Sequence, residues 1–135
     1  MRNCDGCTLC CKIPTVEPIK TSNCLCPFAA QGIGCAIYYR RPKVCKEFQC
    51  AWLAGNLPEQ FAPKQHHLYV AGNLDPDLMI VRVDPDRPDA WKGNAVVEWL
   101  LKKGKHVLVI VGDQINFLQS SGQARPKKVM IDWTL

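Results

Sequence analysis

The sequence predicts an α+β protein made of two parts, a cysteine-rich segment over residues 1–55 and a small α+β lobe over residues 56–135. All nine cysteines lie between Cys4 and Cys50, in a stretch whose prolines and glycines favour loops. After residue 56, β-branched runs alternate with turn residues, and one stretch between them has the spacing of an amphipathic helix. We therefore expect a metal-stapled, loop-rich cysteine cluster with a short helix, followed by a small, mainly antiparallel sheet with one packed helix. A chain of 135 residues is also the usual size of one domain.

The cysteine-rich segment begins with the run CDGCTLCC, from Cys4 to Cys11. Two cysteines separated by two residues bind one tetrahedral ion through a tight turn, and a second pair from a distant segment completes the site. Gly6 permits such a turn because it has no Cβ. The thiols of this run are therefore candidate ligands for one or two metal sites: Cys4, Cys7, Cys10 and Cys11.

The distant ligands are expected in the segments that follow. Residues 13–23 contain two prolines and predict an extended chain, and residues 24–37 predict a loop with too few apolar groups to hold its own shape. Eight of the nine cysteines would form two four-thiolate sites, and one of the pair Cys24 and Cys26 would be left over. The distant candidates are Cys26 (or Cys24), Cys35, Cys45 and Cys50.

A helix is expected from Pro42, a favourable residue for a first turn, to about Ala54. On an unbroken helix, side chains five residues apart point in directions that differ by about 140°. Cys45 and Cys50 could therefore not easily bind one metal ion from such a helix. Either the helix is irregular near Cys50, or the two thiols bind different metals, and we favour the second alternative.

The lobe that follows is expected to contain five strands and one helix. The helix, over about residues 90–103, would begin after the N-cap residue Asp89 and end at Gly104. Continuous β-branched character predicts that Val107–Val111 is a buried central strand. The other strands are expected over residues 67–71 and 79–84, joined by a turn at Asn73–Pro76, and over residues 115–119 and 129–133, which gives the order ββαβββ.

The expected compartment favours metal binding over disulfides. No apolar stretch precedes Cys4, so we expect no signal peptide and a cytoplasmic protein. In a reducing compartment, clustered thiols bind metals more often than they pair. The cofactor would be zinc or an iron–sulfur cluster. The ferredoxin motif requires a cysteine where this chain has Pro14, which disfavours a ferredoxin fold, but the spacing does not choose between zinc and iron.

The formal net charge of +5 is concentrated in residues 1–50, which carry +4. Metal-bound cysteines are thiolates, so eight of them on two divalent ions would bring the whole chain to about +1. The basic residues near the cysteines are thus expected to balance thiolates, and nucleic-acid binding is disfavoured. The longest aliphatic run, Val107–Val111, is too short to cross a bilayer, so no membrane insertion is expected.

The cysteines belong to a longer pattern. The run CDGCTLCC is followed by Cys26-Pro27-Phe28, by GCAIY from residue 34, and by RPKVCKEFQC from residue 41. This pattern, over residues 4–50, resembles the YkgJ-like cysteine-cluster family, also called the CxxCxxCC family, which is described as zinc- or iron-chelating. The resemblance implies eight metal ligands: Cys4, Cys7, Cys10, Cys11, Cys26, Cys35, Cys45 and Cys50. Cys24 departs from the pattern, as a substitute ligand or an extra thiol.

Three other residues near the ligands have alternative interpretations. Arg41 fits a role in hydrogen bonding to thiolates or to a carbonyl around the metal, and it fits a surface charge equally well. Tyr38 and Tyr39 are expected to pack against other residues. No phosphate-binding loop and no catalytic set can be assembled from the sequence, so we favour a non-enzymatic role.

Two classes of function fit these observations. The first is a metal-stapled module for binding or assembly, whose partner is another protein and which could be a structural part of a larger complex such as a virion. The alternative is an iron–sulfur redox or sensor protein, or a protein for metal storage or delivery. The sequence does not indicate an oligomeric state.

Overall fold

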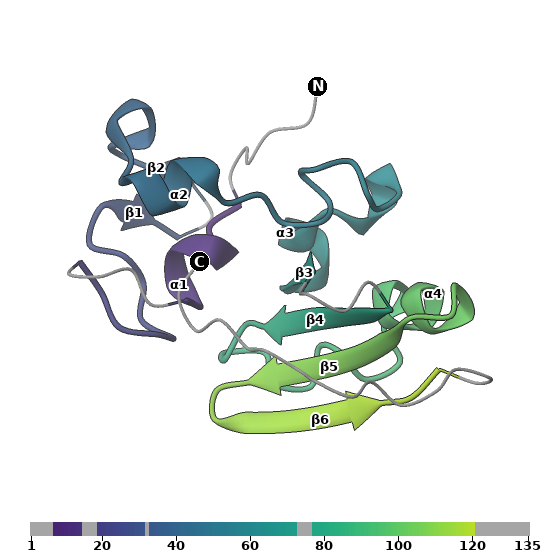
Figure 1. Ribbon diagram of the computed structural model, residues 1–135. Coiled ribbons are helices and arrows are strands. Elements are labelled where there is room, and N and C mark those ends of the chain that lie inside the picture. The colour runs from purple at the N-terminus through teal and green to yellow at the C-terminus, as the bar shows by residue number, and fades with distance from the viewer. Residues whose placement is uncertain (1–6, 15–18, 32, 73–76, 121–135) are drawn as a thin grey trace.

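The computed structural model describes residues 7–14, 19–31, 33–72 and 77–120 (Figure 1). The cysteine-bearing part of the chain lies on one side of the molecule, and a four-stranded sheet lies on the other (Figure 1). The elements, in chain order, are α1 (Leu9–Lys12), β1 (Ala29–Ala30), β2 (Gly34–Cys35), the 3-10 helix η1 (Tyr38–Arg40), α2 (Lys43–Glu47), the 3-10 helix η2 (Glu59–Phe61), α3 (Pro63–His66), β3 (Leu68–Gly72), β4 (Leu78–Val83), α4 (Ala95–Lys102), β5 (His106–Val111) and β6 (Gln114–Leu118). The predicted α+β class is confirmed.

The larger sheet is mixed, with the strand order β3-β4-β5-β6. The pairs β3–β4 and β5–β6 are antiparallel, as expected, but β4 and β5 pair in parallel. The expectation of a mainly antiparallel sheet overlooked this central pair. Its cause is α4, which follows β4 and carries the chain back across the sheet, so that β5 runs in the same direction as β4.

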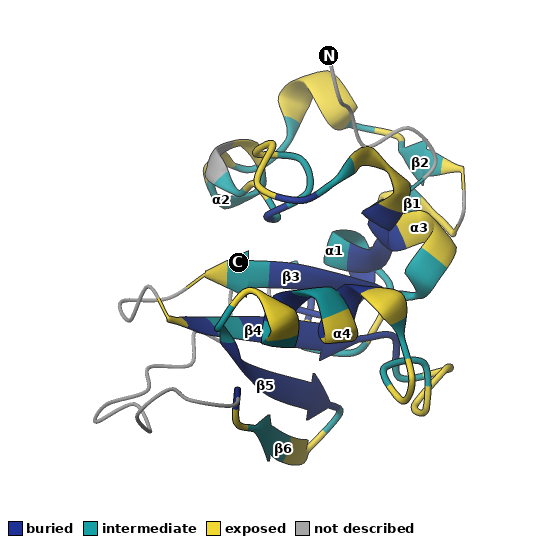
Figure 2. Cartoon of the chain, turned by 90° about the vertical axis from the view of Figure 1, so that its right-hand side faces the viewer, coloured by how far each residue is buried: buried dark blue, intermediate teal, exposed yellow. Residues whose placement is uncertain are grey.

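Helix α4 and the sheet enclose the main hydrophobic core. Successive side chains of a strand point to opposite faces, and the valines at odd positions of β5 lie in one cluster with Val96 and Leu100 of α4. The alternate residues Leu108 and Ile110 lie on the other face. All of β5 is buried, which confirms the predicted central strand, and Figure 2 shows this strand in the colour of buried residues.

Helix α4 begins later than expected. Its N-cap is Asn94, whose side-chain oxygen accepts a hydrogen bond from the Val96 amide at 2.8 Å. The expected cap, Asp89, instead forms an exposed ion pair with Lys92. Gly93, with φ at +65°, turns the chain immediately before the helix, in a conformation that favours glycine. The predicted end at Gly104 is confirmed by its φ of +80°, which is typical of the residue after a helix.

We expect Asn94→Ala to lower the free energy of unfolding by about 1 kcal/mol, because the Val96 amide loses its acceptor. The matched variant Asp89→Ala should change it by less than about 0.5 kcal/mol, because exposed ion pairs contribute little. Urea unfolding followed by tryptophan fluorescence measures both values. A larger loss for Asp89→Ala would place the functional cap where the sequence alone suggested it.

The helix expected over residues 42–54 is much shorter. Helix α2 ends at Glu47, and Phe48 has an extended backbone with ψ at 133°. The cause is a tertiary contact, since the Ala51 amide donates to the Val70 carbonyl oxygen on the edge of β3 at 2.7 Å. Pairing with the sheet thus overrides the helical preference of the local sequence.

Several short elements were not expected. Residues 24–37 contain the antiparallel pair β1–β2, and the chain before β3 contains η2 and α3. The strand expected over residues 129–133 and the turn at residues 73–76 lie outside the described residues. The other strands are confirmed to within one residue at each end.

The cysteine-bearing part packs on the sheet through α1. Leu9 and Ile13 form a small buried cluster with Tyr69 of β3, on the side of β3 opposite the main core. Lys12, at the end of α1, is also buried, and its ammonium group contacts Asp84 at 2.7 Å and Asp86. These contacts join the cysteine-rich segment to the chain that leaves β4.

Candidate metal centre

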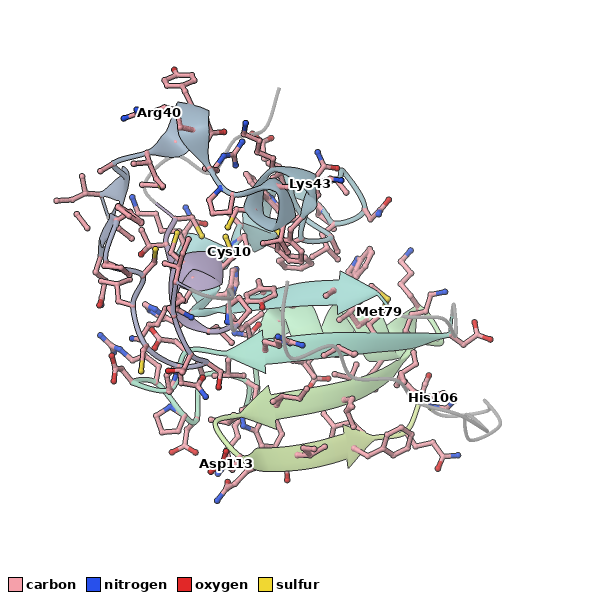
Figure 3. All side chains as sticks on the ribbon, turned by 60° about the vertical axis from the view of Figure 1, so that its left-hand side comes forward. Cys10, Arg40, Lys43, Met79, His106 and Asp113 are labelled. Carbon is pink, nitrogen blue, oxygen red and sulfur yellow. The ribbon has the colours of Figure 1, made fainter. Side chains whose placement is uncertain are left out.

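Eight of the nine cysteines lie in the described part of the chain, and Cys4 lies outside it. All eight are thiols, with no disulfide among them. In Figure 3, several sulfur atoms gather around Cys10, between α1 and α2. Cysteines up to 43 residues apart in sequence, Cys7 and Cys50, are thus brought to one region of the molecule.

Backbone hydrogen bonds bring the loops to α1. The Cys26 amide donates to the carbonyl oxygen of Cys11 at 2.8 Å, which fixes the loop against the helix. The carbonyl oxygen of Cys26 in turn accepts from Ala29, where β1 begins, at 2.9 Å. In the β1–β2 pair, Ala29 lies opposite Cys35. The hairpin therefore carries Cys35 back toward Cys26 and α1.

One group of thiols forms around Cys45. Burial raises the pKa of the Cys45 thiol, and the nearby thiols of Cys11, Cys26 and Cys35 raise it further, whereas Arg41 lowers it. The pKa of Cys11 is lowered to about 7, chiefly by a hydrogen bond with Cys10. Helix α1, the loop at Cys26, strand β2 and helix α2 thus contribute thiols to one electrostatic neighbourhood. We call it the Cys45 group: Cys11, Cys26, Cys35 and Cys45.

A second group forms next to Tyr69. Burial raises the pKa of Cys7, and the Cys50 thiol is among the groups that raise it further. Burial also raises the pKa of Cys50, while hydrogen bonds lower it, including one from the Leu53 amide at 3.5 Å. Burial raises the pKa of Tyr69, and the nearby thiols of Cys10 and Cys50 raise it further. We call these thiols the Cys50 group: Cys7, Cys10 and Cys50.

The two groups can be compared with the expectation that Cys45 and Cys50 bind different metals. Helix α2 ends before Cys50, so the helical angle between the two side chains does not apply to the folded chain. The two groups adjoin one another, because the Cys11 thiol raises the pKa of both Cys45 and Cys7. That the two cysteines bind different metals stays a prediction.

The described side chains, as they stand, contain no group of three or more His, Cys, Asp or Glu residues arranged to hold a metal ion. The chemistry of the donors does fit a metal, because each group consists of thiols, the ligands that zinc and iron–sulfur clusters prefer. Metal binding at these groups would therefore require the thiols to draw closer and to lose their protons.

Two basic residues lie beside the thiols. Lys20 is buried, and its ammonium group donates to the carbonyl oxygens of Lys12, at 3.0 Å, and of Pro14. Burial lowers the pKa of Lys20, whereas nearby thiols, including members of the Cys45 group, raise it. Arg41 donates to the Tyr38 carbonyl oxygen at 2.8 Å, and its role beside a metal stays a prediction. The sequence did not single out Lys20, because a lysine after a proline-containing stretch carries no distinctive local pattern.

Cys24 differs from the other described cysteines. It is exposed, whereas the other seven are half-buried. Its sulfur accepts a hydrogen bond from the Thr21 hydroxyl at 3.6 Å. Asn23, in a left-handed conformation with φ at +60°, turns the chain just before it. Whether Cys24 is a substitute ligand or an extra thiol stays a prediction.

Within the described residues, no helix has the length and apolarity needed to cross a membrane. Comparison of the chain with protein-family models, with curated proteins and with solved structures finds no match. The resemblance to the CxxCxxCC family therefore stays a prediction that rests on the cysteine pattern.

Proposed function

We propose that this chain is a metal-binding protein whose cysteines hold zinc or an iron–sulfur cluster. The metal would staple the cysteine-rich segment into shape, and the protein would act as a binding or assembly module, such as a structural part of a larger complex. The resemblance of residues 4–50 to the CxxCxxCC family supports the same cofactors.

One observation carries this proposal. From Thr21 through Lys46, none of the described residues is buried. Ordering a residue costs about 1–2 kcal/mol of conformational entropy, which burial of apolar side chains normally offsets. Between these two residues that compensation is limited to half-buried side chains. Three of the cysteines of the Cys45 group lie in this stretch, and metal–thiolate bonds could supply the missing free energy.

The two groups of thiols suggest how the metals would be divided. The Cys45 group has four thiols, the number that a structural zinc site or a four-iron cluster uses. The Cys50 group has three described thiols, and Cys4 would be the fourth. This division uses the eight expected ligands and leaves Cys24 as the extra thiol. Fully ligated sites of this kind have no open position for a substrate, which supports a structural role.

The test is anaerobic purification followed by elemental analysis and an absorption spectrum. We expect about two zinc ions per chain in a colourless protein, or iron and sulfide with a broad band near ~400 nm. The zinc result supports a structural module, and the iron result favours the redox or sensor alternative. A folded protein that contains neither metal would refute the proposal.

A further inference from the structure

The stretch from Thr21 through Lys46, which contains no described buried residue, carries most of the exposed large apolar side chains of the described chain. Ile33 is 78% exposed and Tyr39 is 91% exposed. Phe28 and Tyr38 are also exposed. Phe28 immediately precedes β1, Ile33 immediately precedes β2, and Tyr38 and Tyr39 lie in η1. Figure 2 shows the region of β1 and β2 as exposed or half-buried. The expectation that Tyr38 and Tyr39 pack is therefore wrong for Tyr39.

The charge of this region has one sign. Arg40, Lys43 and Lys46 are exposed, and the sequence contains no Asp or Glu from Ile19 through Lys46. Figure 3 places Arg40 at the outer end of the region. We call this set the aromatic–basic surface: Phe28, Ile33, Tyr38, Tyr39, Arg40, Lys43 and Lys46.

We infer that the aromatic–basic surface docks a protein partner through a segment that combines carboxylates with apolar side chains. Tyrosine and arginine, together with tryptophan, are enriched among the residues that contribute most of the binding energy at protein interfaces. Carboxylates of a partner would complement the basic residues, and its apolar side chains would cover Ile33 and Tyr39. The inference rests on the proposed function in one respect, since the metal would hold this segment in shape.

The arrangement disfavours two other occupants. Single-stranded nucleic acid needs successive aromatic rings on which its bases stack. One face of the Tyr38 ring is covered by the Arg41 guanidinium, 4.0 Å from its centroid, and Tyr39 contacts that ring edge-on. A second copy of this chain, bound symmetrically through the same surface, would bring one set of basic residues against the other, and the like charges would repel.

The experiment uses the metal-loaded full chain and a fluorescein-labelled synthetic peptide of alternating Glu and Leu. We expect fluorescence anisotropy to show binding that weakens about tenfold or more in each of the variants Tyr39→Ala, Ile33→Ser and Arg40→Glu. A peptide of alternating Glu and Ser should bind more weakly, and one of alternating Lys and Leu should not bind. Ile115→Ser, on the exposed part of β6, is the matched control and should bind normally.

Metal content is measured for every variant. A variant that keeps its metal but loses the peptide reports on the surface alone, whereas an unsubstituted protein without metal refutes the proposed function instead. The inference is overturned if the Glu–Leu peptide does not bind, or if the three variants bind it normally. It is also overturned if the protein binds oligo-dT, or vesicles of equal parts phosphatidylcholine and phosphatidylserine, more tightly than the Glu–Leu peptide and the same variants abolish that binding. Self-association in sedimentation that the same variants abolish would overturn it as well.

Discussion

Cys45→Ser is expected to remove about one of two metal equivalents and to release the chain between Thr21 and Lys46, while the four-stranded sheet stays folded. The substitution removes one of the four thiols of the Cys45 group. The released segment contains no described buried residue, so nothing in that stretch would replace the lost metal bonds. The sheet is held by a core that includes α4 and no residue of that segment.

Elemental analysis and limited trypsin digestion measure these effects together. Exposed basic residues in the segment, such as Arg40 and Lys46, provide cleavage sites that should become much more sensitive in Cys45→Ser. Circular dichroism should retain the β-sheet signal. Cys24→Ser is the matched control, because Cys24 is the exposed thiol, and it should keep both the metal and the resistance to trypsin.

Two outcomes would contradict this interpretation. If Cys24→Ser loses metal and Cys45→Ser does not, the ligand set is wrong. If Cys45→Ser melts the entire chain in one transition, the sheet depends on the metal centre, and the segment and the lobe are one cooperative unit.

The sheet was the part of the fold most accessible to sequence reasoning. The run from Val107 to Val111 is continuous and β-branched, and such a run has few alternatives to a buried strand. The direction of pairing was less accessible. It depends on α4, which carries the chain from β4 to β5 so that the two strands pair in parallel. A helix between two strands indicates such pairing, and the expected mainly antiparallel sheet did not take this into account.

Long-range contacts explain the elements that were missed. The helix expected over residues 42–54 has acceptable local propensity, but the Ala51 amide binds the Val70 carbonyl oxygen instead. The choice between Asp89 and Asn94 as helix cap was likewise open locally, because both residue types are good caps. The helix end is decided by Val70, a distant residue, and the cap is decided by the turn at Gly93. Neither can be predicted from the local sequence pattern alone.

The candidate site was identified by spacing and assembled by contacts that spacing does not contain. The cysteine pattern predicted the donors. It did not predict that the Cys26 amide would bind the Cys11 carbonyl oxygen, nor that Lys20 would be buried beside these thiols. A buried lysine has the same local sequence as an exposed one, so only the fold could reveal it.

The link between the two parts of the molecule leads to the second large expected effect. Lys12→Met should lower the free energy of unfolding by about 3–5 kcal/mol. The Lys12 ammonium and the Asp84 carboxylate are 2.7 Å apart, and their side chains are 8% and 10% exposed. Methionine fills a similar volume but leaves the Asp84 carboxylate buried without its counter-charge, and that uncompensated charge is the source of the cost.

The exposed pair of Lys92 and Asp89 provides the matched control. The Lys92 ammonium and the Asp89 carboxylate are 3.0 Å apart, close to the distance in the Lys12–Asp84 pair, but their side chains are 62% and 77% exposed. Lys92→Met should therefore change the free energy of unfolding by less than about 0.5 kcal/mol, because water screens such a pair. Urea unfolding at constant metal loading compares the two variants.

The double variant Lys12→Met, Asp84→Leu distinguishes the loss of the ion pair from the cost of leaving the Asp84 carboxylate buried and unpaired. Replacing both partners with apolar side chains removes the uncompensated carboxylate, so it should recover much of the stability that Lys12→Met loses. Asp86, the other carboxylate at Lys12, is 71% exposed and can be hydrated when the lysine is absent. If Lys12→Met and Lys92→Met destabilise equally, the contact between α1 and the chain after β4 is not what joins the cysteine-rich segment to the sheet. That role would then fall to the apolar cluster of Leu9, Ile13 and Tyr69.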